Sequence, residues 1–189
     1  MARSNTSSIA LGSGKLYMVA SADTFQSYDT VCTESNLLGY IKGGATLTYT
    51  EETYEEKDDL GVVSKVITTE EEAILKAGIL TWNADTLAKL IDRCKVTEDS
   101  SKGTKTAKIG GAENSQGNKS YAICFHYHDE EGDIYVLIKG RNTAGVEITF
   151  AKDSGTVINP EFKALPHDDN GTLIEVIEKA TTTSGATGM

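Results

Sequence analysis

The longest run of strand-forming residues extends from 40 to 81 and predicts a long β-hairpin. Thr, Val, Ile and Tyr, which suit a pleated surface, dominate both halves, and Asp58-Asp59-Leu60-Gly61 supplies the turn between them. If residues 45–56 form one strand, it spans roughly 40 Å at ~3.3 Å per residue, whereas the usual strand has about five or six residues. Such an arm outgrows the core of a 189-residue domain, so we expect another molecule to cover it.

One helix is predicted over residues 83–95, because its apolar residues recur at helical spacing. The apolar stripe consists of Leu87, Leu90, Ile91 and Cys94. Asn83 can cap the first turn, and Trp82 before it can pack on Leu87 as a hydrophobic staple. The charges that match the helix dipole, acidic near the start and basic near the end, are Asp85, Arg93 and Lys95.

Shorter strands are predicted on both sides of the hairpin and helix. The clearest alternation of apolar and polar residues covers 121–128 and continues through a turn into a strand over 133–140. The other predicted strands cover 15–20, 146–151 and a last hairpin that pairs 156–165 with 172–178. Pro160 within that hairpin indicates an edge strand.

Three polar segments separate or flank these elements. Residues 1–14 are predicted to form a flexible N-terminal arm, 97–119 a polar surface loop with one weak strand near 106–110, and 180–189 a flexible C-terminal tail. Residues 15–179 are therefore expected to form a single, mainly β domain. We expect a barrel or sandwich with one packed helix and a long hairpin arm.

The charge balance argues against a protein that grips nucleic acid. Lys and Arg number 18 against 28 Asp and Glu, and the net charge is −10. Phosphate binding needs clustered Lys and Arg, and the densest basic stretch, at residues 102–108, has no aromatic residue to stack on bases. No apolar run has the length of a membrane span or a signal peptide, so we expect synthesis in the cytoplasm. Three widely spaced cysteines argue against a disulfide framework.

Candidate catalytic or metal-binding residues are few. His126 and His128 share one face of a predicted strand; such a pair can bind a metal, but no third ligand is implied and we favour polar packing. The segment 168–171 lacks the alternating ligands and closing glutamate of a calcium loop, so a turn explains it better. Residues 12–15 lack the other positions of a P-loop. We therefore expect no metal, no cofactor and no enzymatic activity.

The acidic residues of the predicted arm allow two interpretations. In one, they form a solvated hairpin tip that keeps an open strand edge from aggregating. That interpretation does not account for the length of the arm or for its apolar base. In the other, neither face is wholly apolar because the sheet continues between subunits, one side meeting water and the other a neighbour. Several such hairpins side by side could close into a ring without open edges.

The order of motifs over residues 39–95 supports the second interpretation. A glycine-rich strand at Gly39–Tyr49 precedes Lys57-Asp58-Asp59 at the turn, a return strand at Val66–Ala73, and Gly78–Asn83 before the helix. This order resembles phage tail tube (major tail) proteins, in particular those of phages and prophages of Gram-positive bacteria. The later strands agree with that family in their order.

The resemblance implies a tail-tube-like fold and hexameric rings that stack into a hollow tube, with the hairpins forming an inner β-barrel. An acidic lumen would repel phosphates and let DNA slide, and which strand face looks inward stays open. Candidates for the lumen lining are Thr48, Thr50, Glu52, Thr68, Glu70 and Glu72. Candidates for contacts between rings or subunits are Glu55, Glu56, Lys57, Asp58 and Asp59, with the N-terminal arm.

The implied partners are further copies of the chain, the tape measure protein, the tail terminator and baseplate or distal tail proteins. DNA would pass without specific binding, and a sheath would be added only in a contractile tail, an alternative that stays open. The implied location is the virion, assembled in the cytoplasm of the host bacterium, with no membrane partner.

Two other classes remain. A ring protein of the type VI secretion tube would be expected to lack the long polar segments seen here. A β-sandwich adhesion or decoration module of a tail would be expected to cluster aromatic residues on its surface, whereas Trp82, the single tryptophan, is assigned to the helix staple.

Overall fold

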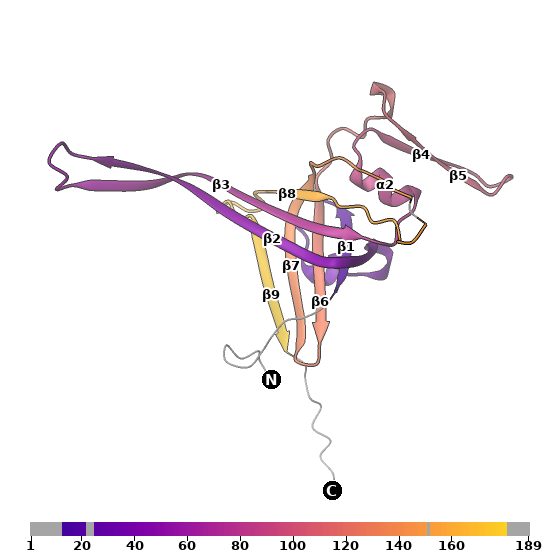
Figure 1. Ribbon diagram of the computed structural model, residues 1–189, viewed down its shortest axis with the longest axis horizontal. Helices are drawn as coiled ribbons and strands as arrows, with labels where there is room; N and C mark the ends of the chain where they lie inside the picture. Colours follow the sequence, from indigo (N-terminus) through magenta and orange to yellow (C-terminus); the bar gives the residue numbers. More distant parts are fainter. Residues whose placement is uncertain (1–12, 22–24, 151, 181–189) are drawn as a thin grey trace, which may run out of the picture.

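The computed structural model describes residues 13–21, 25–150 and 152–180, and the fold is mainly antiparallel β. Nearly all of the predicted N-terminal arm and C-terminal tail lies outside these residues. A compact body bears two hairpins that project in opposite directions, the longer of which is the predicted arm (Figure 1). Within the described ranges, no helix has the length and apolar character needed to cross a membrane.

Six strands of the body pair in a closed cycle and make a barrel. In order around the sheet they are β1 (Lys15–Ala20), β2 (Leu37–Lys57), β3 (Ser64–Ile79), β8 (Glu161–Leu165), β7 (Gly132–Asn142) and β6 (Tyr121–Asp129), and β6 pairs again with β1. β9 (Ile174–Ala180) pairs with the first part of β7 outside this cycle. The predictions of a strand over 15–20, of the long hairpin and of the 121–140 pair of strands are confirmed.

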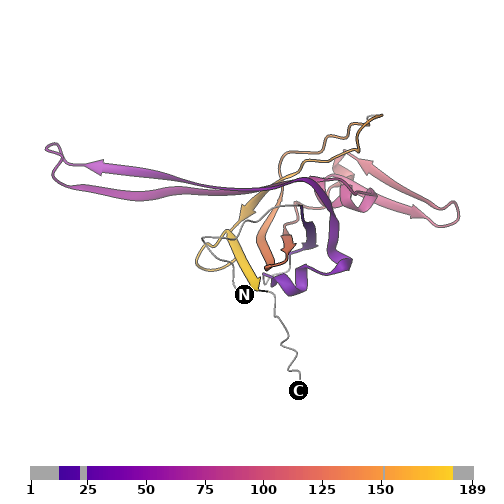
Figure 2. The same ribbon diagram turned by 60° about the horizontal axis from the view of Figure 1, so that its bottom comes forward.

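Strand alternation sorts the apolar residues of the barrel into an inner and an outer core. Leu16, Ile123 and Phe162 are fully buried inside, with residues of β3 such as Leu75. Tyr17 and Cys124, one position away from inner residues, instead point outward. The short helix α1 (Tyr28–Val31) covers this outer core, followed by the 3-10 turn η1 (Glu34–Asn36) (Figure 2).

The predicted helix forms, but it is shorter than expected. α2 spans Ala84–Leu90 and packs Leu87 and Leu90 against the inner core. It ends there because Ile91 is extended, with φ −120° and ψ 114°, so Arg93 and Lys95 cannot match the helix dipole. Cys94 is nevertheless buried in the same core, because it begins a strand that passes beside the helix.

The weak strand predicted near 106–110 forms as β5 (Thr104–Ile109), but the segment 97–119 is mostly a second hairpin and not a loop. β4 (Cys94–Asp99) pairs with β5, and the 3-10 turn η2 (Ala112–Asn114) follows. Val96 and Ala107 lie opposite each other and pack against the inner core. The polar composition was misleading because the other face of this two-stranded sheet meets solvent.

Two predictions near the C-terminal end are wrong. Of the strand predicted over 146–151, residues 146–150 form none, and Ala151 lies outside the described residues; Val146 and Ile148 pack against the core without joining a ladder. The last predicted hairpin also does not exist, because β8 pairs with β3 and β7, and β9 pairs with β7 alone. β8 is therefore an interior strand, which is possible because Pro160 lies just before its first residue.

Candidate functional site

The arm formed by β2 and β3 is the candidate functional site, because its strands run far beyond their other partners. β2 pairs with β1 only over Leu37–Tyr40, and β3 pairs with β8 only over Ile74–Lys76. The β2–β3 ladder itself continues to Lys57 opposite Ser64. Each strand of the arm thus presents one open edge to solvent over the outer part of its length (Figure 1). Every residue from 46 to 71 is exposed.

Two irregularities shape the arm. Where it leaves the barrel, Lys42–Gly44 lie opposite Gly78 alone, and Gly43 and Gly44 take positive φ values of 86° and 84°. Such backbone angles favour glycine, which explains the glycine pair at the base of the arm. A second shift between Glu52 and Thr53 leaves one extra residue in β3, so that the pairing changes along the outer half.

The register divides the base of the arm into two different faces. The core-side face, which continues the barrel interior, contains Leu47 and Tyr49 opposite the buried residues Leu75 and Ala73. The polar face, which continues the barrel exterior, has Thr48 and Thr50 on β2. Because residues directly opposite share a face, Glu52, Glu70 and Glu72 also belong to the polar face.

Five of the six candidate lumen residues therefore lie together. Thr68 is the exception: it pairs with Thr53 across the second irregularity and falls on the core-side face. Glu72, at the body end of the polar face, forms an ion pair with Lys163 of β8 at 2.5 Å. That hydrogen bond and the nearby carboxylate charge raise the pKa of Lys163. The polar face of the arm thus continues onto β8 at Lys163.

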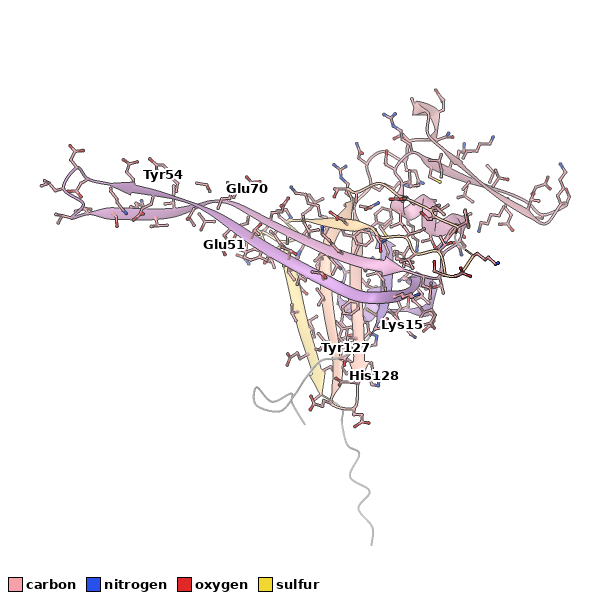
Figure 3. All side chains as sticks on the ribbon, in the orientation of Figure 1. Lys15, Glu51, Tyr54, Glu70, Tyr127 and His128 are labelled. Carbon is pink, nitrogen blue, oxygen red and sulfur yellow. The ribbon has the colours of Figure 1, made fainter. Side chains whose placement is uncertain are left out.

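Like charges face each other across the middle of the arm, in the region where Figure 3 labels Glu51 and Glu70. In the register, Glu51 lies opposite Glu71, and Glu52 lies opposite Glu70. The Tyr49 hydroxyl lies 2.7 Å from a carboxylate oxygen of both Glu51 and Glu71. Its hydrogen bonds to Glu71 and Glu51 raise the pKa of this phenol. Directly opposed carboxylates destabilise an isolated hairpin, so these pairs do not help the arm to fold.

The candidate contact residues surround the tip. Asp58 holds the turn, since its Oδ1 accepts a hydrogen bond from the Val63 backbone N–H at 2.8 Å. Lys57 pairs with Glu55 at 3.0 Å, and Tyr54 donates to Glu56. Three apolar residues of the tip were not among the predicted contact residues, yet each has an exposed fraction of two thirds or more. They are Leu60, Val62 and Val63.

The predicted helix cap is confirmed. Asn83 Oδ1 accepts hydrogen bonds from the backbone N–H groups of Asp85 at 2.9 Å and Thr86 at 3.0 Å, and Thr86 completes a capping box. Trp82 packs against the core that contains Leu87, and its ring also lies 6.3 Å from that of Phe150. Trp82, Asn83, Asp85 and Thr86 also line a groove of about 380 Å³ beside α2.

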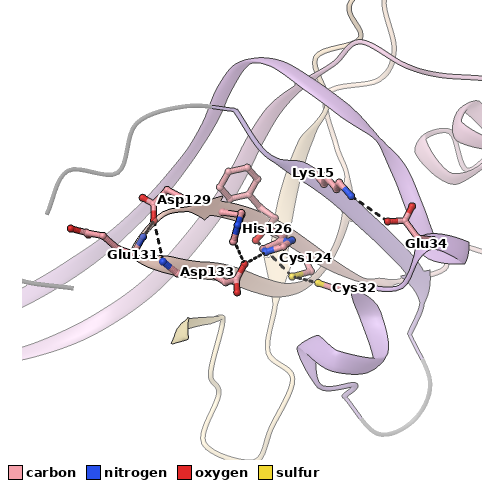
Figure 4. Close-up of polar contacts among 11 residues, drawn as sticks. Lys15, Cys32, Glu34, Cys124, His126, Asp129, Glu131 and Asp133 are labelled. Carbon is pink, nitrogen blue, oxygen red and sulfur yellow. Dashed lines mark hydrogen bonds and ion pairs between the residues drawn. The ribbon is translucent and has the colours of Figure 1, made fainter. Parts of the chain in front are cut away.

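The two histidines on β6 both form hydrogen bonds with one carboxylate, that of Asp133. His126 Nε2 and His128 Nδ1 lie 2.7 Å and 2.8 Å from Oδ1 of Asp133 (Figure 4). Burial raises the pKa of Asp133, but the hydrogen bonds and charges of the two imidazoles outweigh it and bring the pKa below its usual value. Among the described residues, no group of three or more His, Cys, Asp or Glu side chains is arranged to hold a metal ion.

The segment 168–171 is a turn, as expected. The Asp168 carboxylate accepts hydrogen bonds from the backbone N–H groups of Asn170 and Thr172, and Gly171 takes a positive φ of 80°.

Comparison of the chain with protein-family models and with curated proteins found no match.

Proposed function

We propose that this chain is the subunit of a stacked-ring tube of the phage tail tube type. The observation that supports it best is the arm, which has an open edge on each strand beyond the barrel. Long open edges tend to pair with other chains. Arms from neighbouring subunits would pair edge to edge, and a closed ring of them would leave none of these edges free.

The two faces of the arm support one orientation within such a ring. On the core-side face, the exposed fractions of Leu47 and Tyr49 are 37% and 45%, although both residues lie opposite buried ones. These side chains would be covered by the body of a neighbouring subunit. The polar face would then line the lumen with Thr48, Thr50, Glu52, Glu70 and Glu72. Its carboxylates would repel the phosphates of passing DNA.

The tip fits a contact between stacked rings. Leu60, Val62 and Val63 form an apolar end on an otherwise acidic arm. Clustered exposed apolar residues of this kind usually mark an interaction site. In the proposed tube they would pack on the next ring, while Glu55, Glu56 and Asp59 form the polar rim of that contact. The tape measure protein would occupy the lumen during assembly.

A shortened arm tests the proposal. Replacing residues 52–70 by Asn-Gly keeps Glu51 opposite Glu71 and closes the strands with a two-residue turn. Sedimentation velocity should show rings or larger species for the unmodified chain and monomers for the shortened variant. Circular dichroism should show a folded β monomer that loses only the strand signal of the removed ladder and keeps its melting temperature, because the removed residues are exposed and lie outside the barrel.

A length-matched control separates the length of the arm from its charge. Replacing Glu51, Glu52, Glu70 and Glu71 by glutamine preserves the ladder and removes the opposed charges, so this variant should still assemble. The proposal would be wrong if the unmodified chain stays monomeric at high concentration, or if the shortened variant assembles as well as the full-length arm.

A further inference from the structure

Cys32 and Cys124 lie in contact, although 92 positions separate them in the sequence. Their Sγ atoms are 2.8 Å apart, and the Cys32 thiol donates to Cys124 Sγ (Figure 4). Both are free thiols. The third cysteine, Cys94, is buried in the inner core, whereas this pair lies in the outer core. The contact is therefore specific to two of the three cysteines.

The surrounding packing holds the two sulfur atoms together. Cys32 caps the C-terminal end of α1, where its backbone N–H donates to Tyr28 O at 2.8 Å. Val31 beside it is fully buried, and the Tyr28 ring lies 4.6 Å from that of Tyr135 on β7. Cys124 projects from the middle of β6, a strand paired on both sides. The 2.8 Å between the two sulfur atoms is about 0.8 Å more than the length of a disulfide bond.

The two thiols differ in their access to solvent. Cys124 is fully buried, and the hydrogen bond from Cys32, together with burial, raises the pKa of the Cys124 thiol. Cys32 is only partly buried at the edge of the outer core. An oxidant from solvent therefore meets Cys32 first, and Cys124 is placed behind it as the resolving thiol.

We propose that Cys32 and Cys124 are a reversible disulfide site that is oxidised by hydroperoxides. The Cys32 thiolate attacks one peroxide oxygen, the O–O bond breaks, and Cys32 sulfenic acid and hydroxide form. The Cys124 sulfur then attacks the Cys32 sulfur, the S–O bond breaks, and water leaves as the disulfide forms. In total the two thiols lose two protons and two electrons, and hydrogen peroxide becomes two molecules of water.

The bridge would fasten α1 to β6 and convert a packing contact into a covalent one. A reducing cytosol would keep the pair as thiols, and an oxidising exterior would close it. Closing a loop of this length restricts the unfolded chain, so the melting temperature should rise by about 10 °C. This inference is independent of the arm and of tube assembly.

Oxidation of the purified full chain with hydrogen peroxide tests the site. Thiol titration should fall from three free thiols to one, and tryptic mass spectrometry should find the Cys32 peptide linked to the Cys124 peptide, with Cys94 free. The rise in melting temperature should reverse with dithiothreitol. A Cys94→Ala variant should behave in the same way, with free thiols falling from two to none.

The Cys32→Ser variant is the matched control, because residue 32 is only partly buried and serine preserves its size. It should retain two free thiols and show no rise in melting temperature. The site would be refuted if peroxide carries Cys32 to sulfinic acid without a bridge, if the link joins Cys94 or a second chain, or if all three thiols survive treatment.

Discussion

Individual side chains of this protein are sorted by the alternation of β-strands into an inner core, an outer core and solvent. On β6, Ile123 points into the barrel while its neighbour Cys124 points toward α1. On β8, Phe162 is fully buried and lies opposite Leu75 of β3. The stability of the body therefore depends on a few large residues at the correct parity.

Replacing Phe162 by alanine should destabilise the body by about 3–5 kcal/mol, because it removes a large side chain from a closed core. Phe150, which is 80% exposed, offers a control of the same residue type. Phe150→Ala should change the free energy of unfolding by no more than about 0.5 kcal/mol. Urea denaturation of the two variants, each made in the shortened-arm background, provides the measurement. An equal loss of unfolding free energy in Phe162→Ala and Phe150→Ala would contradict this packing.

The Asp133 carboxylate should make stability depend on pH in the acidic range. Its pKa is lower in the folded state than the ordinary value of 3.8, so the folded state binds this proton less readily than the unfolded state. The stabilisation is fully present above about pH 4–5 and disappears as pH falls through the lower, folded pKa. Urea midpoints between pH 6 and 2.5 should show that the deficit of Asp133→Asn shrinks at the acidic end. A deficit that is constant over this range would contradict the assignment.

At the scale of elements, local patterns predicted β1, the long arm, β6, β7 and the start of α2. Their signals lie within single segments: alternation on β6, and the Asn83 cap on α2. The C-terminal end of α2 was misplaced because the spacing of Cys94 suits both a further helical turn and the strand that forms there.

Pairing over long distances could not be predicted. β8 takes its place between β3 and β7 because the barrel must close, and no nearby residue signals this. Because β3 has an extra residue, Thr68 and Glu70 lie on different faces of the arm, although an even spacing normally places two strand residues on the same face. The Cys32–Cys124 contact was likewise missed, since only the fold brings β6 beneath α1.

The charge of the polar face should control the affinity of the assembled protein for DNA. Glu52→Lys with Glu70→Lys places two lysines directly opposite each other, away from the body. Assembled protein with these lysines should bind a labelled DNA at least about tenfold more tightly in low salt than the unmodified assembly, and added salt should remove the difference. Fluorescence anisotropy provides the measurement.

The neutral pair Glu52→Gln with Glu70→Gln controls for the loss of the carboxylates. A lumen role for this face would be contradicted if the lysine and glutamine variants assemble equally and bind DNA with the same affinity.

Over the whole molecule, a stable barrel supports an arm that the barrel does not need. β2 contains 21 residues, and most of them lie beyond the strands of the body. Every residue from 46 to 71 is exposed, the edges of the arm are open, and its tip ends in Leu60, Val62 and Val63. In the proposed assembly, neighbouring copies would pair the open edges of their arms, and the next ring would cover the apolar tip.

Negative-stain electron microscopy of the purified full chain is the most direct measurement of that account. The proposed assembly predicts hollow tubes or six-fold rings for the unmodified chain, and single particles of monomer size for the variant in which residues 52–70 are replaced by Asn-Gly. Dispersed single particles of monomer size for the unmodified chain at high protein concentration would contradict it.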